Sequence, residues 1–93
     1  MFVLHVIIEM KPGQAAAAEQ VFSGPFKAAI SAQPGFRDVQ FLKSQDGGGY
    51  ILRIAFESQA LQQQWIATKL HGEVWTEMEK HFAGYSLATF TAV

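Results

Sequence analysis

Residues 2–10 are dense in β-branched and aromatic residues, and they predict a β-strand that ends at the turn residues Lys11-Pro12-Gly13. Alternate positions along this strand share a face. One face carries Phe2, Leu4, Val6, Ile8 and Met10, and the other carries Val3, His5, Ile7 and Glu9. Both faces are largely apolar, which favours a sheet that is covered on both sides.

From Gln14 to Gln33 the apolar residues recur every three or four positions, which predicts a helix. Gly24-Pro25 interrupts this pattern, because proline lacks a backbone donor and clashes with the carbonyl group near Val21. A kink or two abutting helices are expected there. Pro34-Gly35 then ends the helical region.

Residues 36–43 and 50–57 read as two strands joined by a loop whose three consecutive glycines, Gly47 to Gly49, permit a hairpin. Ser58 is placed to cap a following helix that carries Leu61 and Trp65. We expect a break in this helix near Leu70-His71-Gly72, a stop at Gly84 and a final strand over residues 85–93.

The order βαββαβ in 93 residues predicts one domain, residues 1–93, with the α+β ferredoxin-like sandwich fold and an antiparallel sheet. Helices would cover one sheet face. Because the first strand is apolar on both faces, we expect the other faces of two copies to pack together in a symmetric homodimer.

The composition narrows the classes of partner. The net charge is −1 and the seven Lys and Arg residues are scattered, so neither nucleic acid nor a membrane surface is indicated. No signal peptide or membrane span is recognisable, and a cytoplasmic location is expected. There is no cysteine, and the three histidines lack metal-site spacing, so no metal is expected.

Several short motifs resemble the antibiotic biosynthesis monooxygenase (ABM) family of small dimeric α+β barrels. The resemblance spans nearly the whole chain and is carried by Lys11-Pro12-Gly13, Pro34-Gly35-Phe36, Phe41-Leu42-Lys43-Ser44, Tyr50-Ile51-Leu52, Phe56-Glu57-Ser58, Trp65, His71 and Tyr85. It implies an oxidoreductase that needs no cofactor and oxidises a polycyclic or quinol-like aromatic in a cleft between sheet and helices.

The same resemblance implies the site residues. His5 matches a polar position on strand one, Trp65 matches the helix tryptophan, and His71 lies where members often carry a polar group. His5 departs from the asparagine that several oxygenases have. Haem-degrading relatives share the barrel, but their Asn, Trp and His set is not reproduced, because residue 75 is Trp.

The hypothesis is therefore that His5 or His71 acts as a catalytic base or hydrogen-bond donor, since histidine titrates near neutrality. Trp65, Phe22 and Phe56 would bind a small hydrophobic or aromatic substrate.

A purely structural interpretation stands beside each assignment. His5 could be a bonded structural histidine, His71 a capping or surface residue, and Trp65 only a core residue, while His81 is expected to be structural and Trp75 to lie in the core or a dimer interface. Two other functions stay open: a non-enzymatic domain that binds a small apolar ligand, and a proton-transfer isomerase on the same scaffold.

Overall fold

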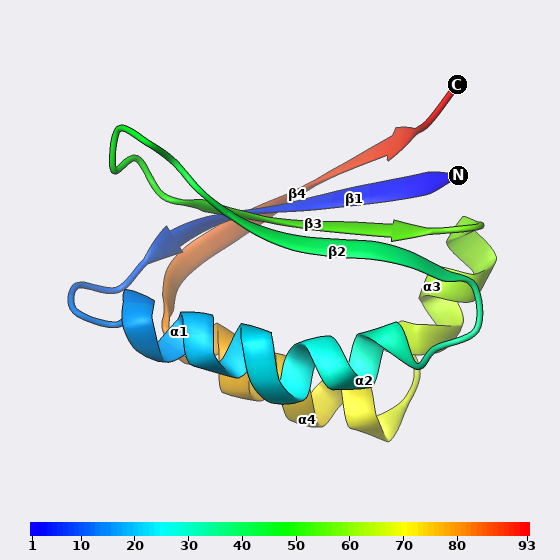
Figure 1. Ribbon diagram of the computed structural model, residues 1–93, viewed down its shortest axis with the longest axis horizontal. Coiled ribbons are helices and arrows are strands. Elements are labelled where there is room, and N and C mark those ends of the chain that lie inside the picture. The colour runs from blue at the N-terminus through cyan, green and yellow to red at the C-terminus, as the bar shows by residue number, and fades with distance from the viewer.

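The computed structural model describes all 93 residues, and its elements follow the predicted βαββαβ order (Figure 1). The strands form one antiparallel sheet in the order β2-β3-β1-β4, which confirms the ferredoxin-like fold. The elements are β1 (Phe2–Met10), α1 (Ala15–Val21), the π-helix η1 (Phe22–Phe26), α2 (Lys27–Ser31), β2 (Phe36–Lys43), β3 (Tyr50–Phe56), α3 (Gln59–Ile66), α4 (Lys69–Glu79) and β4 (Phe82–Thr91).

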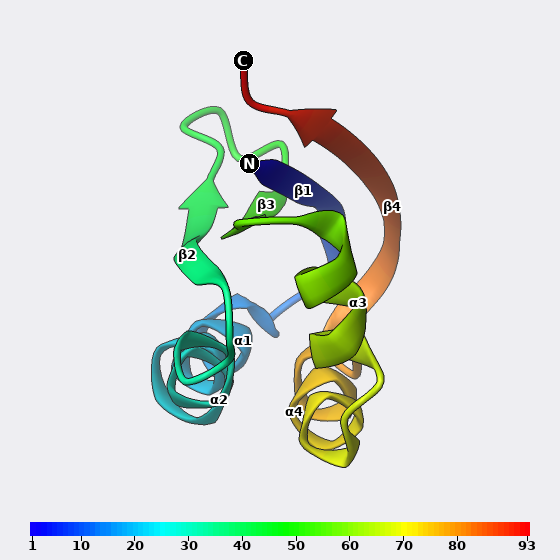
Figure 2. The ribbon, with the colours of Figure 1, turned by 90° about the vertical axis from the view of Figure 1, so that its right-hand side faces the viewer.

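All the helices lie on one side of the sheet (Figures 1 and 2). The side chains of Leu4, Val6 and Ile8 point toward them and belong to a core cluster of 17 buried residues. Burying one such aliphatic side chain contributes roughly 1.5–3 kcal/mol. The opposite side of the sheet carries no helix, and we call it the open face.

The helical interruption predicted at Gly24-Pro25 takes the form of the π-helix η1, which contains Pro25. A π-turn has a wider hydrogen-bonding period than an α-turn, so it accommodates a residue without a backbone donor while the helix continues. The chain therefore runs from α1 through η1 into α2 without leaving helical geometry.

The predicted break in the second helical region is present, but it lies a few residues before Leu70-His71-Gly72. The break lies at Ala67 and Thr68, where the Thr68 hydroxyl accepts a hydrogen bond from the His71 backbone N–H (3.1 Å) and caps α4. The Thr68 cap favours a helix start more strongly than the single glycine at position 72 favours a helix end. His71 and Gly72 therefore lie in the first turn of α4. The Ser58 cap of α3 is confirmed, with a hydrogen bond from Leu61 N–H (3.2 Å).

The predicted stop at Gly84 is wrong. Helix α4 ends at Glu79, and Gly84 lies inside β4, which begins at Phe82 rather than at residue 85. The register of β4 against β1 shifts between Glu9 and Met10, next to this glycine. Gly84 thus belongs to an irregular part of the strand, a common role of glycine inside a sheet.

Two side-chain contacts join the first helix to the rest of the fold. The buried ring of His81 has its Nδ1 2.8 Å from Oε1 of Gln14, so this histidine is structural, as expected. The Tyr50 hydroxyl donates to the Glu19 carboxylate, and this bond to an anion raises the pKa of Tyr50 to about 12. Both contacts hold helix α1 against the end of the sheet.

The β2–β3 hairpin generates a test of backbone geometry. A Cβ atom at Gly49 (φ +124°) would lie 2.7 Å from the Ile8 carbonyl oxygen, whereas one at Gly47 (φ +79°) would meet nothing within 4 Å. We expect Gly49→Ala to lower the free energy of unfolding by more than about 2 kcal/mol and Gly47→Ala by about 1 kcal/mol. Urea denaturation of both variants measures the difference, and equal losses would contradict it.

Candidate functional site

A cavity of about 240 Å³ lies between the helix side of the sheet and helices α3 and α4; we call it the Trp-His cavity. Nearly all of its wall is apolar. It is lined by Leu4, Val6, Phe26, Ile54, Gln62, Trp65, Ile66, His71, Trp75, Tyr85 and Leu87. Such a wall suits a small, largely apolar ligand.

Trp65 and His71 meet in this cavity, as the sequence predicts for two of the candidate residues. Trp65 is on α3 and is almost fully buried, while His71 is on α4 and is half-buried. Their ring centroids lie 5.0 Å apart in an edge-to-face arrangement. The Thr68 cap at the break between the two helices turns the chain so that the rings can meet.

Trp75 completes the aromatic wall, and the sequence interpretation missed this position. Its indole lies nearly parallel to the His71 ring, at a centroid separation of 6.3 Å and an interplanar angle of 7°. It also makes an edge contact with Tyr85 at 5.3 Å, and its Nε1 donates to Glu79 (2.6 Å). The spacing was a usable signal, because residues four apart on a helix share a face and Trp75 is four beyond His71.

The environment of His71 controls its protonation. Burial among apolar groups disfavours the charged imidazolium and lowers the pKa of His71 below its ordinary value of 6.5. The imidazole is therefore neutral at pH 7 and able to accept a proton.

Gln62 is the second polar group of the cavity, and no sequence pattern marked it. Gln62 lies on α3 among uncharged residues, and it is only 3% exposed. Its carbonyl oxygen accepts a hydrogen bond from Nε2 of Gln63 (3.2 Å). No protein acceptor engages its amide nitrogen, so this N–H donor is available to a ligand.

The prediction that His5 borders the same cleft is wrong. His5 pairs with Arg53 and Ala88 across the strands, and its ring lies 4.9 Å from that of Phe90 on the open face. Successive side chains of a strand point to opposite faces, so the apolar neighbours Leu4 and Val6 face the helices while His5 faces away from them.

Phe22 and Phe56 are not in the cavity either. Phe56 is fully buried in the core with its ring against Phe36, and Phe22 packs on Phe41 and Phe26. Phe26 lines the cavity instead. Of the three residues predicted to bind a substrate, only Trp65 lines the Trp-His cavity.

The family model for antibiotic biosynthesis monooxygenases matches residues 1–77, most of the chain. The chain belongs to the antibiotic biosynthesis monooxygenase family. Family membership supports a monooxygenase-type role for this ABM protein. A search of curated proteins found no match.

Solved structures share the ABM fold. A candidate ABM protein of Caulobacter crescentus CB15 is 20% identical with a TM-score of 0.86, over 99% of this chain and 89% of that one. SnoaB, a cofactor-independent oxygenase of Streptomyces nogalater, is 22% identical with a TM-score of 0.75, over 99% and 90%. A mutant of MhuD, solved with two manganese protoporphyrin IX molecules per active site, is 23% identical with a TM-score of 0.78, over 100% and 95%. At these identities the likeness concerns the fold.

No helix of the protein is both long enough and apolar enough to cross a bilayer.

The lowered pKa of His71 gives a pH test. The unfolded chain binds this proton more readily than the folded chain, so the contribution of His71 to stability is present above pH 6.5 and is lost as the pH falls below that value. We expect the His71 ring resonances to titrate with a midpoint below 6.5. An NMR titration that follows each of the three histidines measures this midpoint, and a His71 midpoint above 6.5 would contradict the prediction.

Proposed function

We propose that this ABM protein is a cofactor-independent monooxygenase that oxidises a hydroxyaromatic or quinol-type small molecule in the Trp-His cavity. The observation that carries the proposal is a neutral histidine between two indole rings in a largely apolar cavity. Deprotonation of the substrate needs a base, and the reaction of its anion with dioxygen is favoured where water is scarce.

Each lining residue then has a role in the reaction. A ring nitrogen of His71 takes the proton from the substrate, and the indoles of Trp65 and Trp75 hold the aromatic ring. The Gln62 amide donates a hydrogen bond to the oxygen on which negative charge develops, a group that a preorganised donor stabilises. His5 has no part in this step, because it lies on the other side of the sheet.

The electron balance of such an oxidation requires no cofactor. When a ring CH₂ group becomes C=O, one atom of dioxygen enters the substrate and the other leaves as water with the two hydrogens. The substrate supplies the electrons and dioxygen is the oxidant. The protein's task is to bind, to deprotonate and to limit water.

The test is oxygen uptake with anthrone-type and hydroquinone-type substrates. We expect His71→Ala to lower kcat by about 10²–10⁴-fold, because a positioned general base contributes about that factor. His5→Gln is the matched control, a histidine variant outside the cavity, and it should keep the wild-type kcat.

Three outcomes separate the competing functions. Turnover that continues without dioxygen identifies the isomerase. Saturable quenching of tryptophan fluorescence without turnover identifies a ligand-binding domain. Equal loss of activity in the His5 and His71 variants would contradict the assignment of the base to His71.

A further prediction concerns Gln62. We expect Gln62→Leu to weaken the transition-state contact and lower kcat/KM by about 10–100-fold, since one hydrogen bond to a charged group is worth about 1.5–3 kcal/mol. Gln62→Asn keeps an amide donor. It should recover part of this loss in kcat/KM, but only for substrates that carry an oxygen on the ring held inside the cavity. An unchanged kcat/KM in the leucine variant would remove Gln62 from the mechanism.

We also propose that the protein is a homodimer through the open face of the sheet. Ile7, Leu42 and Phe90 lie on this face and are between 42% and 50% exposed in the single chain. Large apolar side chains gathered on one uncovered face are typical of an interface. Light scattering at micromolar concentration should give twice the chain mass of 10.3 kDa, and a mass of 10.3 kDa would exclude the dimer.

A further inference from the structure

The Trp-His cavity has a closed end and an open end, which the exposure of its lining residues distinguishes. Three lining residues, Ile66, Tyr85 and Leu87, are between 41% and 61% exposed, and they form the mouth of the cavity. Six others are buried and form its closed end: Leu4, Val6, Phe26, Ile54, Gln62 and Trp65.

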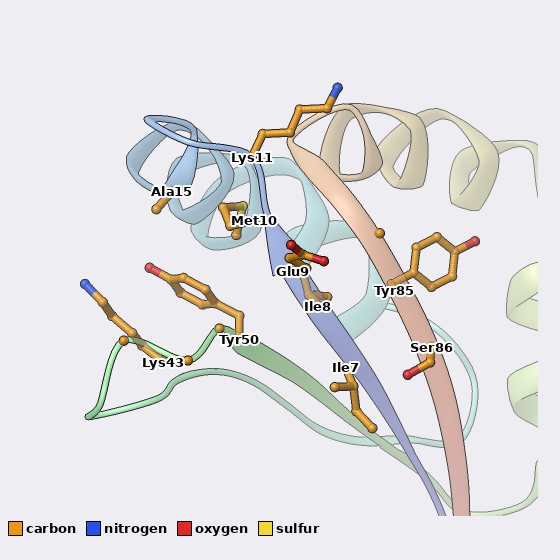
Figure 3. A pocket seen from close by; sticks show the side chains of 14 residues that line it. Ile7, Ile8, Glu9, Met10, Lys11, Ala15, Lys43, Tyr50, Tyr85 and Ser86 are labelled. Atoms are coloured by element: carbon orange, nitrogen blue, oxygen red, sulfur yellow. The ribbon is translucent and has the colours of Figure 1, made fainter.

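The mouth lies between the end of α3 and the edge of the sheet. Ile66 is the last residue of α3, and Leu87 pairs with Val6 from the outermost strand β4, so no further strand covers this side. Figure 3, which looks into a separate depression beside the β2–β3 hairpin, shows Tyr85 and Ser86 leaving β4 on opposite sides. Tyr85 thus projects on the side of the mouth.

The buried amide of Gln62 gives the cavity a polar group at its closed end. Ile66 follows one helical turn later on the same face of α3, about 6 Å along the helix axis. A ligand whose oxygen meets the Gln62 amide therefore extends its apolar part toward the mouth. No Asp, Glu, Lys or Arg lines the cavity, so a charged substituent at the closed end would lose water without gaining an ionic partner.

The volume of the cavity limits the number of rings. An apolar protein cavity of about 150 Å³ holds one benzene ring. At the same volume for each ring carbon, two fused rings need about 250 Å³ and three need about 350 Å³. The Trp-His cavity, at about 240 Å³, matches two fused rings.

We infer that the cavity selects an uncharged hydroxyarene of two fused rings, bound with its hydroxyl group at the closed end, and that Ile66 and Leu87 set this size limit. The inference deepens the proposed function and rests on it for the reaction. It adds the size, the charge and the orientation of the substrate.

The mouth supplies the physical reason for the limit. The second ring of such a ligand reaches Ile66 and Leu87 and covers apolar surface that is otherwise exposed, which favours binding. A third ring would have to occupy the space of these two side chains. Ile66 and Leu87 are therefore specificity-determining residues.

A series of hydroxyarenes tests the size limit. Both tryptophans of the chain line this cavity, so their fluorescence reports its occupancy. We expect 2-naphthol to bind at least about tenfold more tightly than phenol, because each further carbon removed from water tightens binding about threefold. The three-ring 2-hydroxyanthracene should bind at least about tenfold more weakly than 2-naphthol, and equal or tighter binding of it would overturn the limit.

Leu87→Ala tests the residue that sets the limit. We expect this variant to bind 2-hydroxyanthracene at least about fivefold more tightly than the wild type does, because the space at the mouth is opened. Leu70→Ala is the matched control, since Leu70 is also an exposed leucine but does not line the cavity. The same change in both variants would remove Leu87 from the assignment.

Two isomeric acids test the orientation at pH 8, where His71 is neutral. The carboxylate of 3-hydroxy-2-naphthoate lies beside the hydroxyl group and would enter the closed end, whereas that of 6-hydroxy-2-naphthoate lies on the other ring and would point to the mouth. We expect the 3-hydroxy isomer to bind at least about tenfold more weakly than the 6-hydroxy isomer. Equal affinities would overturn the inward orientation of the hydroxyl group.

Oxygen uptake separates this inference from the proposed function. When naphthalene-1,4-diol is oxidised to its hydroxyquinone, one atom of dioxygen enters a ring C–H bond and the other leaves as water, so dioxygen is the only oxidant. A higher kcat/KM for this diol than for the three-ring anthrone, after subtraction of the uncatalysed rate, supports both proposals.

The remaining outcomes overturn one proposal or both. Tightest binding of the two-ring compound without oxidation of any compound overturns the monooxygenase and leaves the size limit intact. Oxidation of anthrone with the higher kcat/KM overturns the size limit and leaves the monooxygenase intact. Neither binding nor oxidation of any compound overturns both.

Discussion

The alternation of side chains along β1 is the constraint on which the rest of the structure depends. As a central strand it pairs with both β3 and β4, and its even-numbered residues form the core and part of the cavity wall. Its odd-numbered residues form the middle of the open face. A shift of register by one residue would exchange the two sets, so the same alternation fixes the cavity and the candidate interface together.

Cavity geometry depends on a second local device, the Thr68 cap. The hydroxyl group of Thr68 donates to the Trp65 carbonyl oxygen (2.8 Å) at the end of α3 and accepts from His71 at the start of α4. One side chain thus binds the backbone of both residues whose rings meet in the cavity. A continuous helix would place residues 65 and 71 on different faces, because six positions correspond to about 600° of rotation.

The fold was readable from the sequence, because strand alternation, helical spacing and the Ser58 cap agree about the same topology. The sequence also names Trp65 and His71 as candidates, and both line the Trp-His cavity. His5 lies outside the cavity although its chain neighbours Leu4 and Val6 line it, because successive side chains of a strand point to opposite faces. Gln62 carried no signal, since its burial results from how α3 and α4 meet rather than from any pattern in QALQQQW.

The π-helix at Pro25 has a consequence for how the helical region can vary. A π-turn contains more residues than an α-turn, so side chains after it are rotated relative to an uninterrupted helix. Phe22, before the turn's end, packs toward β2, whereas Phe26 reaches the cavity wall. The extra residue therefore rotates the side chains that follow it relative to those of α1. Helix α1 packs against the sheet edge, while the residues after the π-turn are oriented separately toward the cavity wall.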